Sequence, residues 1–153
     1  MSKGLKVSLL IVGAVVILAG LVFAGTKVEA SRPDDVSREV WYDTKEAYEV
    51  IVQMVEDTRK GAKVDEAQEM DRVSKMRKYI IKYVDSNFDG TPKEEEMTMT
   101  VNFMYTNALT WSVEYMNKEH GEKYDEQELN KAWENYVNLK EQLEDELFLI
   151  NLP

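Results

Sequence analysis

The chain has 153 residues, a net charge of −10, no cysteine, and only 7 glycines and 3 prolines. This length suits one domain with an accessory segment, and the low glycine and proline content favours helices over an all-β fold. The absence of cysteine excludes disulfides, thiolate zinc sites, a cysteine nucleophile and a lipid-modified cysteine anchor. The acidic balance argues against nucleic-acid binding, which needs a basic surface.

An apolar segment near the N-terminus predicts a membrane-spanning helix. Residues 7–25 carry no charge, and a run of about 18 or more apolar residues can cross a bilayer as a helix. Lys3 and Lys6 precede the run and mixed charges follow it. This pattern places the N-terminus in the cytoplasm and the chain after residue 30 outside. We therefore expect a single-pass protein of the cell membrane.

The same segment also fits a cleaved signal peptide and a secreted protein. Ala24 and Ala30 are small residues at positions where a signal peptidase can cut. On either interpretation, residues 1–30 are an anchor or a signal and residues 31–153 form an external domain.

The first two helices expected in this domain span residues 35–60 and 65–84. The first has apolar residues at helical spacing, and Gly61 ends it. The second begins at Asp65, which has N-cap spacing to Gln68. This is the one basic helix of the chain, and we expect its Lys and Arg side chains to lie beside acidic neighbours, with anionic lipid or a partner as the alternative. Its expected inward residues are Ala67, Met70, Val73, Ile80 and Val84.

Two further helices are expected over residues 92–120 and from residue 125 onward. Gly121 ends the former, and Asp125 begins the latter with Glu128 as its capping partner. The expected inward face of the third helix comprises Met97, Val101, Met104, Ala108, Ser112 and Tyr115, widened by Phe103 and Trp111. That of the fourth comprises Leu129, Trp133, Tyr136, Leu143, Leu147 and Ile150.

Short connections between long helices make antiparallel neighbours. The sequence therefore predicts an all-α protein in which the N-terminal transmembrane or signal helix precedes an up-down-up-down bundle of about four helices. A short basic tail, one apolar segment and an external helical bundle resemble, in architecture alone, the LemA-type envelope proteins of bacteria. The "QLxRRxxLIPNLV" stretch of that family is absent, so the resemblance assigns no residue a role.

The connection "DSNFDGTPKEEE", residues 85–96, resembles the calcium loop of an EF-hand. The pattern D-x-[DN]-x-[DN]-G-x5-E is filled without a gap, with Gly90 at the position of the sharp bend. Calcium takes six to eight oxygen ligands, partly from side chains and one backbone carbonyl of such a loop. The predicted metal ligands are Asp85, Asn87, Asp89, the Thr91 carbonyl and Glu96.

The same stretch also has the features of an ordinary helix start. Thr91 suits an N-cap, Pro92 the first helical position and Glu94 the reciprocal capping partner. Proline at position eight of the loop also lacks the N–H through which paired EF-hands bridge. A second loop, residues 117–128, matches the pattern poorly because its glycine comes one place early. The sequence leaves open whether the first loop binds calcium or only turns the chain.

The sequence offers little to support catalysis. His120 is the only histidine, and no Glu-x-x-His pair of a di-iron bundle is present. We therefore expect a non-enzymatic, membrane-anchored envelope protein whose external helical domain binds a protein partner. The alternative is a calcium-binding EF-hand-like module, secreted or anchored.

Overall fold

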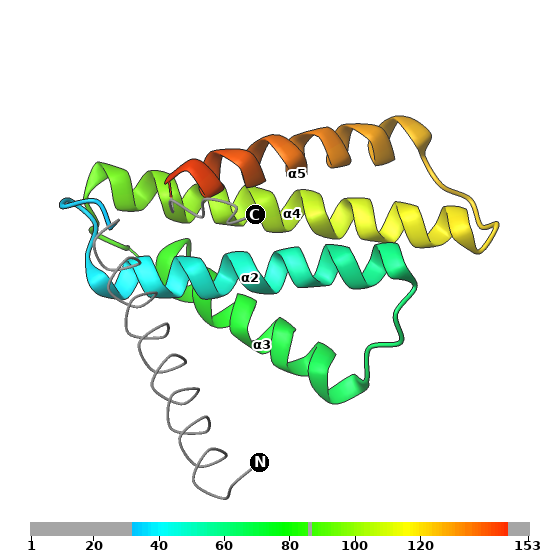
Figure 1. The fold of residues 1–153 in the computed structure, drawn as a ribbon, viewed down its shortest axis with the longest axis horizontal. Coiled ribbons are helices and arrows are strands. Elements are labelled where there is room, and N and C mark those ends of the chain that lie inside the picture. Colours follow the sequence, from blue (N-terminus) through cyan, green and yellow to red (C-terminus); the bar gives the residue numbers. More distant parts are fainter. Residues whose placement is uncertain (1–31, 86, 147–153) are drawn as a thin grey trace, which may run out of the picture. The chain divides into compact units, whose positions relative to one another are not determined.

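The computed structural model describes residues 32–85 and 87–146 of the chain. Within these residues the regular secondary structure is entirely α-helical, and successive helices reverse direction (Figure 1). The helices are α2 (Arg38–Lys60), α3 (Glu66–Tyr83), α4 (Pro92–Glu119) and α5 (Glu126–Glu146). The predicted all-α, up-down-up-down bundle is confirmed for this part of the chain.

The apolar segment expected to cross the membrane, residues 7–25, lies outside the described residues, as does the apolar C-terminal stretch 147–153. None of the described helices has the length and apolar character needed to cross a membrane.

The helix ends follow from local sequence chemistry. Helix α2 begins at Arg38 because the Ser37 hydroxyl accepts a hydrogen bond from the backbone N–H of Val40 at 3.3 Å. It ends where Gly61 adopts a φ of 58°, a left-handed conformation that glycine tolerates best. Asp65 caps α3 as expected, accepting from the N–H of Gln68 at 2.9 Å. The sequence thus placed the helix boundaries to within about three residues.

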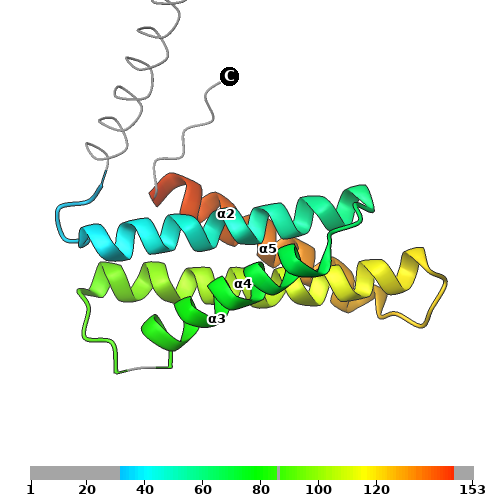
Figure 2. The same cartoon turned by 90° about the horizontal axis from the view of Figure 1, so that it is seen from below.

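Helix α4 is the central element of the described domain. It packs against α2 on one side and α5 on another, while α3 lies obliquely across the outside (Figures 1 and 2). The core forms between α2, α4 and α5, and the second half of α3 adds Met76, Tyr79 and Tyr83 to it. Its largest fully buried side chains include Trp41, Ile51, Met97, Met104 and Leu143.

Helix α3 departs from the sequence prediction. Of its expected inward residues, Ala67, Met70 and Val73 are exposed, with Met70 retaining 65% of its accessible surface. The cause is the oblique course of α3, whose first half diverges from α2 (Figure 1). The buried residues of this helix are Met76, Tyr79 and Tyr83. Phe103 of α4 was likewise expected inside and is 52% exposed.

Ion pairs supply much of the contact between α3 and α2. Lys82 Nζ lies 2.5 Å from Glu39 Oε1 and 2.6 Å from Asp43 Oδ2, and the Tyr83 hydroxyl donates to Asp43 at 2.6 Å. Farther along, Lys75 pairs with Glu46 and Arg72 with Asp57. The expectation that this basic helix lies beside acidic neighbours is therefore confirmed.

The carboxylate of Glu94 joins the starts of two helices. One oxygen accepts from the backbone N–H of Thr91 at 2.8 Å, and the other from the backbone N–H of Ser37 at 2.7 Å. Thr91 and Ser37 are the N-caps of α4 and α2, whose first turns lie side by side at the same end of the bundle (Figures 1 and 2). The Thr91 hydroxyl adds a 2.7 Å bond to the Asp35 carbonyl. One buried anion thus satisfies donors at two helix N-termini, where negative charge is favoured.

We expect Glu94→Ala to lower the free energy of unfolding of residues 31–153 by about 2–3 kcal/mol, because it removes two charge-assisted hydrogen bonds and leaves the N–H groups of Thr91 and Ser37 without this acceptor. Urea unfolding followed by circular dichroism measures the change. Glu95→Ala is the matched control, since Glu95 lies in the same helical turn but is exposed, and it should cost no more than about 0.5 kcal/mol. Equal losses in the two variants would contradict the bridge.

The contribution of Glu94 should also depend on pH. Burial raises the pKa of its carboxyl, but hydrogen bonds from Ser37 and Thr91 outweigh burial and lower the pKa below its usual value. A lowered folded-state pKa stabilises the protein above the unfolded-state pKa of about 4.3, and that stabilisation is lost as pH falls through the folded-state pKa. The difference between parent and Glu94→Ala should therefore narrow below about pH 4. A difference independent of pH would show that the charge of Glu94 is not what stabilises the helix starts.

Candidate functional site

The divergence of α3 leaves a groove of about 900 Å³ at one end of the bundle. The groove lies between the last turns of α2, the connection that follows them, the first half of α3 and the second half of α4. Exposed or half-buried apolar side chains contribute much of its wall: Met54 from α2, Val64 from the connection, and Leu109, Val113 and Met116 from α4. Two of these are methionines, whose flexible side chains adapt to different apolar partners.

Charged residues of both signs surround these apolar side chains. Asp57, Arg59 and Lys60 lie on the α2 side, and Glu119 and His120 lie at the end of α4. On the α3 side, Arg72 donates to Asp57, which also accepts from Gln53, and these bonds, the one from Arg72 foremost, hold the pKa of the Asp57 carboxyl below its usual value. The ion pair is mostly buried, with each side chain 16% exposed. It joins the first half of α3 to α2 in the wall of the groove.

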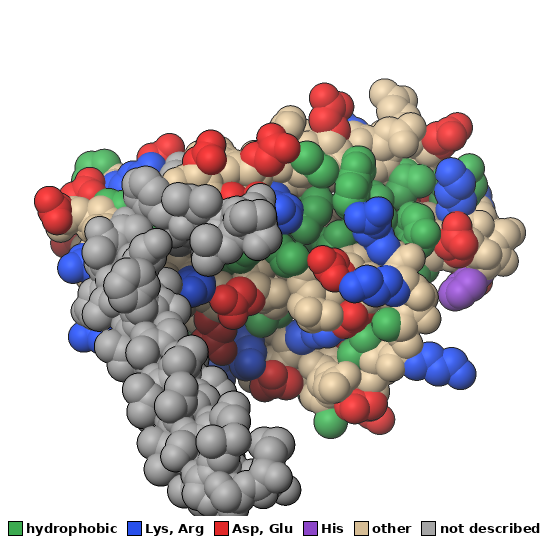
Figure 3. All heavy atoms as spheres, in the orientation of Figure 1, with side chains coloured by type: hydrophobic (Ala, Val, Ile, Leu, Met, Phe, Trp, Pro, Cys, Tyr) green, Lys and Arg blue, Asp and Glu red, His purple; other side chains and the backbone are tan. Residues whose placement is uncertain are grey.

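On the face seen in Figure 3, apolar side chains are again surrounded by charged ones. Hydrophobic side chains gather over the part of α2, α4 and α5 that lies toward the α4–α5 connection, and acidic side chains are scattered around them. On α5, the Trp133 ring stacks obliquely against Trp111 with 4.9 Å between ring centroids, and the guanidinium of Arg59 lies 5.6 Å from the Trp133 centroid. Arg59, which lines the groove, therefore also shields a half-buried aromatic residue of the adjacent surface.

The predicted calcium ligands are dispersed along the α3–α4 connection and the first turn of α4. Asp85, Asn87 and Asp89 are exposed, and Glu96 lies within α4, where its carboxylate pairs with Lys93 at 3.1 Å. Among the described residues, no group of three or more His, Asp or Glu side chains lies close enough together to hold a metal ion. Calcium binding by this loop stays a prediction.

The start of α4, predicted as the alternative to a calcium loop, is present with all its capping interactions. Thr91 and Glu94 form a reciprocal capping box, in which the Thr91 hydroxyl accepts from the Glu94 N–H at 3.2 Å and the Glu94 carboxylate accepts from the Thr91 N–H. Pro92 occupies the first turn, where its missing N–H is not needed.

Gly90 has a packing role in this connection. Among the glycines that the structure describes, only Gly61 and Gly121 have positive φ. A Cβ on Gly90 would lie 2.4 Å from the ring of Phe88, which packs edge-on against Tyr83 with 5.0 Å between centroids. The glycine that matched the calcium-loop pattern therefore also makes room for an aromatic side chain that anchors the connection to α3.

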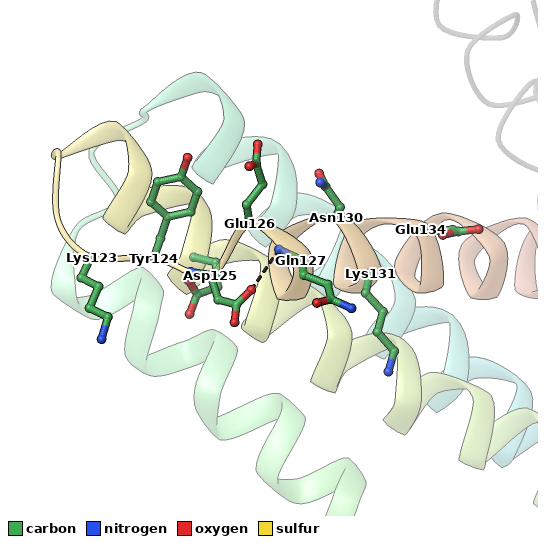
Figure 4. A pocket seen from close by; sticks show the side chains of 9 residues that line it. Lys123, Tyr124, Asp125, Glu126, Gln127, Asn130, Lys131 and Glu134 are labelled. Atoms are coloured by element: carbon green, nitrogen blue, oxygen red, sulfur yellow. Dashed lines mark hydrogen bonds between the residues drawn. The ribbon is translucent and has the colours of Figure 1, made fainter.

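The α4–α5 connection forms a shallow, open depression of about 1030 Å³ (Figure 4). Asp125 caps α5 as expected, accepting from the N–H groups of Gln127 and Glu128 at 2.9 and 3.0 Å. The reciprocal bond was expected from Glu128, but the Asp125 N–H instead donates to Glu114 of α4 at 2.7 Å. Figure 4 shows Lys123 and Lys131 pointing to one side and Glu126 and Asn130 to another, so these side chains do not converge on one point. This depression is therefore a weaker candidate than the groove.

Comparisons with protein-family models, with curated proteins and with solved structures found no match for this chain.

Sequence reasoning missed the groove, although the sequence carries a signal for it. Residues 97–113 contain no charged residue in a chain of which 31% is charged. A helix with one buried face ordinarily carries charges on the other, so an uncharged stretch of this length indicates that both faces of α4 avoid charge. What the sequence does not reveal is that α3 diverges and leaves part of this second face accessible.

We expect Thr91→Ala to cost about 1–2 kcal/mol of stability, in chelator and in millimolar calcium alike, because it removes an N-cap. Melting curves of residues 31–153 measure this loss. The exposed Thr106→Ala in the same helix is the control and should cost less, since its hydroxyl bonds only to a carbonyl within the helix.

The same melting curves test calcium. A bound ion stabilises the parent by about 2.7 kcal/mol when calcium exceeds its dissociation constant a hundredfold. If Glu96 is the bidentate ligand of such an ion, Glu96→Gln abolishes most of that gain. A parent whose melting is the same in calcium and in chelator would end the calcium hypothesis.

Proposed function

We propose that this protein is a non-enzymatic binding protein of the cell envelope, whose helical domain docks a protein partner in the groove between α2, α3 and α4. The observation that carries the proposal is the pairing of exposed apolar side chains, Leu109, Val113 and Met116, with a concave surface of about 900 Å³. Isolated exposed apolar residues are common on proteins, whereas a cluster of them in a concavity is typical of binding sites.

The chemistry of the groove favours a partner segment with apolar and charged faces. Val113 and Met116 are three residues apart on α4 and, with Leu109, line one side of the groove. An amphipathic helix offers apolar side chains at the matching spacing of three and four residues. The surrounding charges, Arg59 and Lys60 on one side and Glu119 on the other, suit a segment that carries charges of both signs.

The proposal includes the membrane location expected from residues 7–25. An apolar run of this length after two lysines supports a single-pass anchor with the helical domain outside. A domain anchored in this way meets partners in the same envelope, so the proposed role is to recruit or position a neighbouring envelope protein.

The groove predicts a specific loss of partner capture. We expect full-length protein, crosslinked in cells and purified from the envelope, to carry a reproducible partner that is lost with Met116→Lys. This substitution places a charge among the apolar side chains of the groove. Mass spectrometry of the crosslinked species measures the result.

Phe103→Lys is the matched control, because Phe103 is an apolar residue of α4 with similar exposure, 52% against 44% for Met116, that does not line the groove. The partner should be retained with this variant. Loss of the partner in both variants, or in neither, would contradict docking in the groove.

The anchor predicts a topology. We expect protease added outside intact cells to digest the chain beyond about residue 35, and the protein to stay with the membranes on fractionation. A soluble product that begins at residue 25 or 31 would show signal cleavage and secretion instead. A chain protected in the cytosol would contradict both interpretations.

A further inference from the structure

The side of the groove that α3 contributes has almost no buried residues. This wall segment comprises residues 61–74, which are the connection after α2 and the first half of α3. Every residue of the wall segment is exposed except Val64 and Arg72, which are half-buried. Among the described residues, neither the buried core nor the partly buried apolar side chains packed against it include a member of the wall segment. The hydrophobic effect therefore contributes little to holding this segment in place.

The second half of α3, in contrast, is anchored in the core. Its side chains Met76, Tyr79 and Tyr83 are between 1% and 5% exposed. The Tyr79 hydroxyl also lies 3.0 Å from the hydroxyl of Thr44 on α2, within hydrogen-bond distance. The change from an unanchored to an anchored helix therefore falls in the middle of α3, just before Met76.

One mostly buried ion pair joins the helical part of the wall segment to α2. Arg72 donates to Asp57, and each of the two side chains is 16% exposed. Asp57 is held in turn by Gln53, which donates to it at 2.9 Å from the preceding turn of α2. A charge-assisted hydrogen bond shielded from water is stronger than an ion pair on the open surface. We therefore expect this pair to decide how firmly the wall segment is held.

The helical part of the wall segment is too short to be stable by itself. It spans residues 66–74, whereas isolated helices shorter than about 12–15 residues are marginal in water. Its apolar side chains Ala67, Met70 and Val73 are already exposed, so unwinding these turns brings little further apolar surface into water. A segment with few buried contacts opens at a lower free-energy cost than the whole domain.

From this distribution of contacts we propose that the wall segment is a movable wall, which unfolds locally and reforms while the core of the bundle stays intact. Because Val64, Glu69 and Arg72 line the groove, opening removes its α3 side and makes Val113 and Met116 of α4 more accessible. The use of this opening, to admit a partner segment from the side, rests on the proposed function. The opening itself is a property of the protein without its partner.

Hydrogen–deuterium exchange measures the opening. Purified full-length protein is reconstituted in lipid vesicles, and overlapping peptides are analysed by mass spectrometry. We expect the amides of residues 70–74 to be protected at least about tenfold less than those of residues 77–82, because only the latter lie in the anchored half of α3. Both stretches lie beyond the first turn, where amides lack helical acceptors, so helix-end effects do not account for a difference. Uniform protection along α3 would overturn the proposal.

Asp57→Asn tests whether the ion pair holds the wall segment. Asparagine preserves the size of the side chain but removes its charge, so exchange of residues 70–74 should rise about tenfold while that of residues 77–82 stays unchanged. Glu46→Gln is the matched control. It removes a pair with Lys75 at 3.4 Å whose side chains are 58% and 41% exposed, and it should change exchange by less than about twofold.

Two outcomes with these variants would also overturn the proposal. One is an equal rise of exchange in both stretches with Asp57→Asn, which would show that the whole domain is destabilised. The other is an equal effect of Glu46→Gln, which would show that the mostly buried pair has no special part in holding the wall segment. Because exchange is measured without a partner, failure of docking in the groove leaves these results unchanged, and uniform exchange along α3 leaves docking in the groove untouched.

Discussion

The carboxylate of Glu94 is the constraint on which the bundle depends. It accepts from backbone N–H groups of both Ser37 and Thr91, so it aligns the first turns of α2 and α4. That alignment sets which side chains of the two parallel helices meet along their length, including Ile51, Val101 and Ala108 of the core. A buried carboxylate is costly in general, but here its two oxygens each have a donor, and the N-termini of both helices favour negative charge. The same carboxylate therefore caps the start of α4 and joins α4 to α2.

At the other end of the bundle, the contact between α2 and α3 is of a different kind. There α3 is held to α2 by charge as well as by packing, and the pair Arg72–Asp57 lies where the two helices have separated. Apolar packing would draw the helices together and close the space between them, since apolar surface gains by leaving water. An ion pair fixes a separation without requiring close approach of the backbones. The groove beside Met54 and Met116 lies where α3 keeps an ion pair to α2 but contributes no buried apolar side chain, since its buried residues all lie in its second half.

Local chemistry in the sequence predicted the helices and their ends, because caps such as Asp65 and Thr91 act within a few residues. The inward faces of α2 and α4 were also predictable wherever apolar spacing coincides with the core. The exposure of the first half of α3 was not predictable, because periodicity identifies an apolar face but not the angle at which a helix crosses its neighbour. The residues concerned are Ala67, Met70 and Val73. The second acceptor role of Glu94 was likewise hidden. A capping box predicts its bond to Thr91, whereas its bond to Ser37 joins residues 57 positions apart.

The outer face of α4 is the feature that core packing leaves unexplained. A solvent-facing helix surface in a strongly acidic protein gains solubility from charge, and α2, α3 and α5 all carry charges on their exposed sides. Helix α4 instead exposes Met99 and Phe103 among threonines and asparagines. This part of its surface has no charged side chain to keep it hydrated. Its position on the central helix places any contact made on this face beside the core residues Met97, Val101 and Met104.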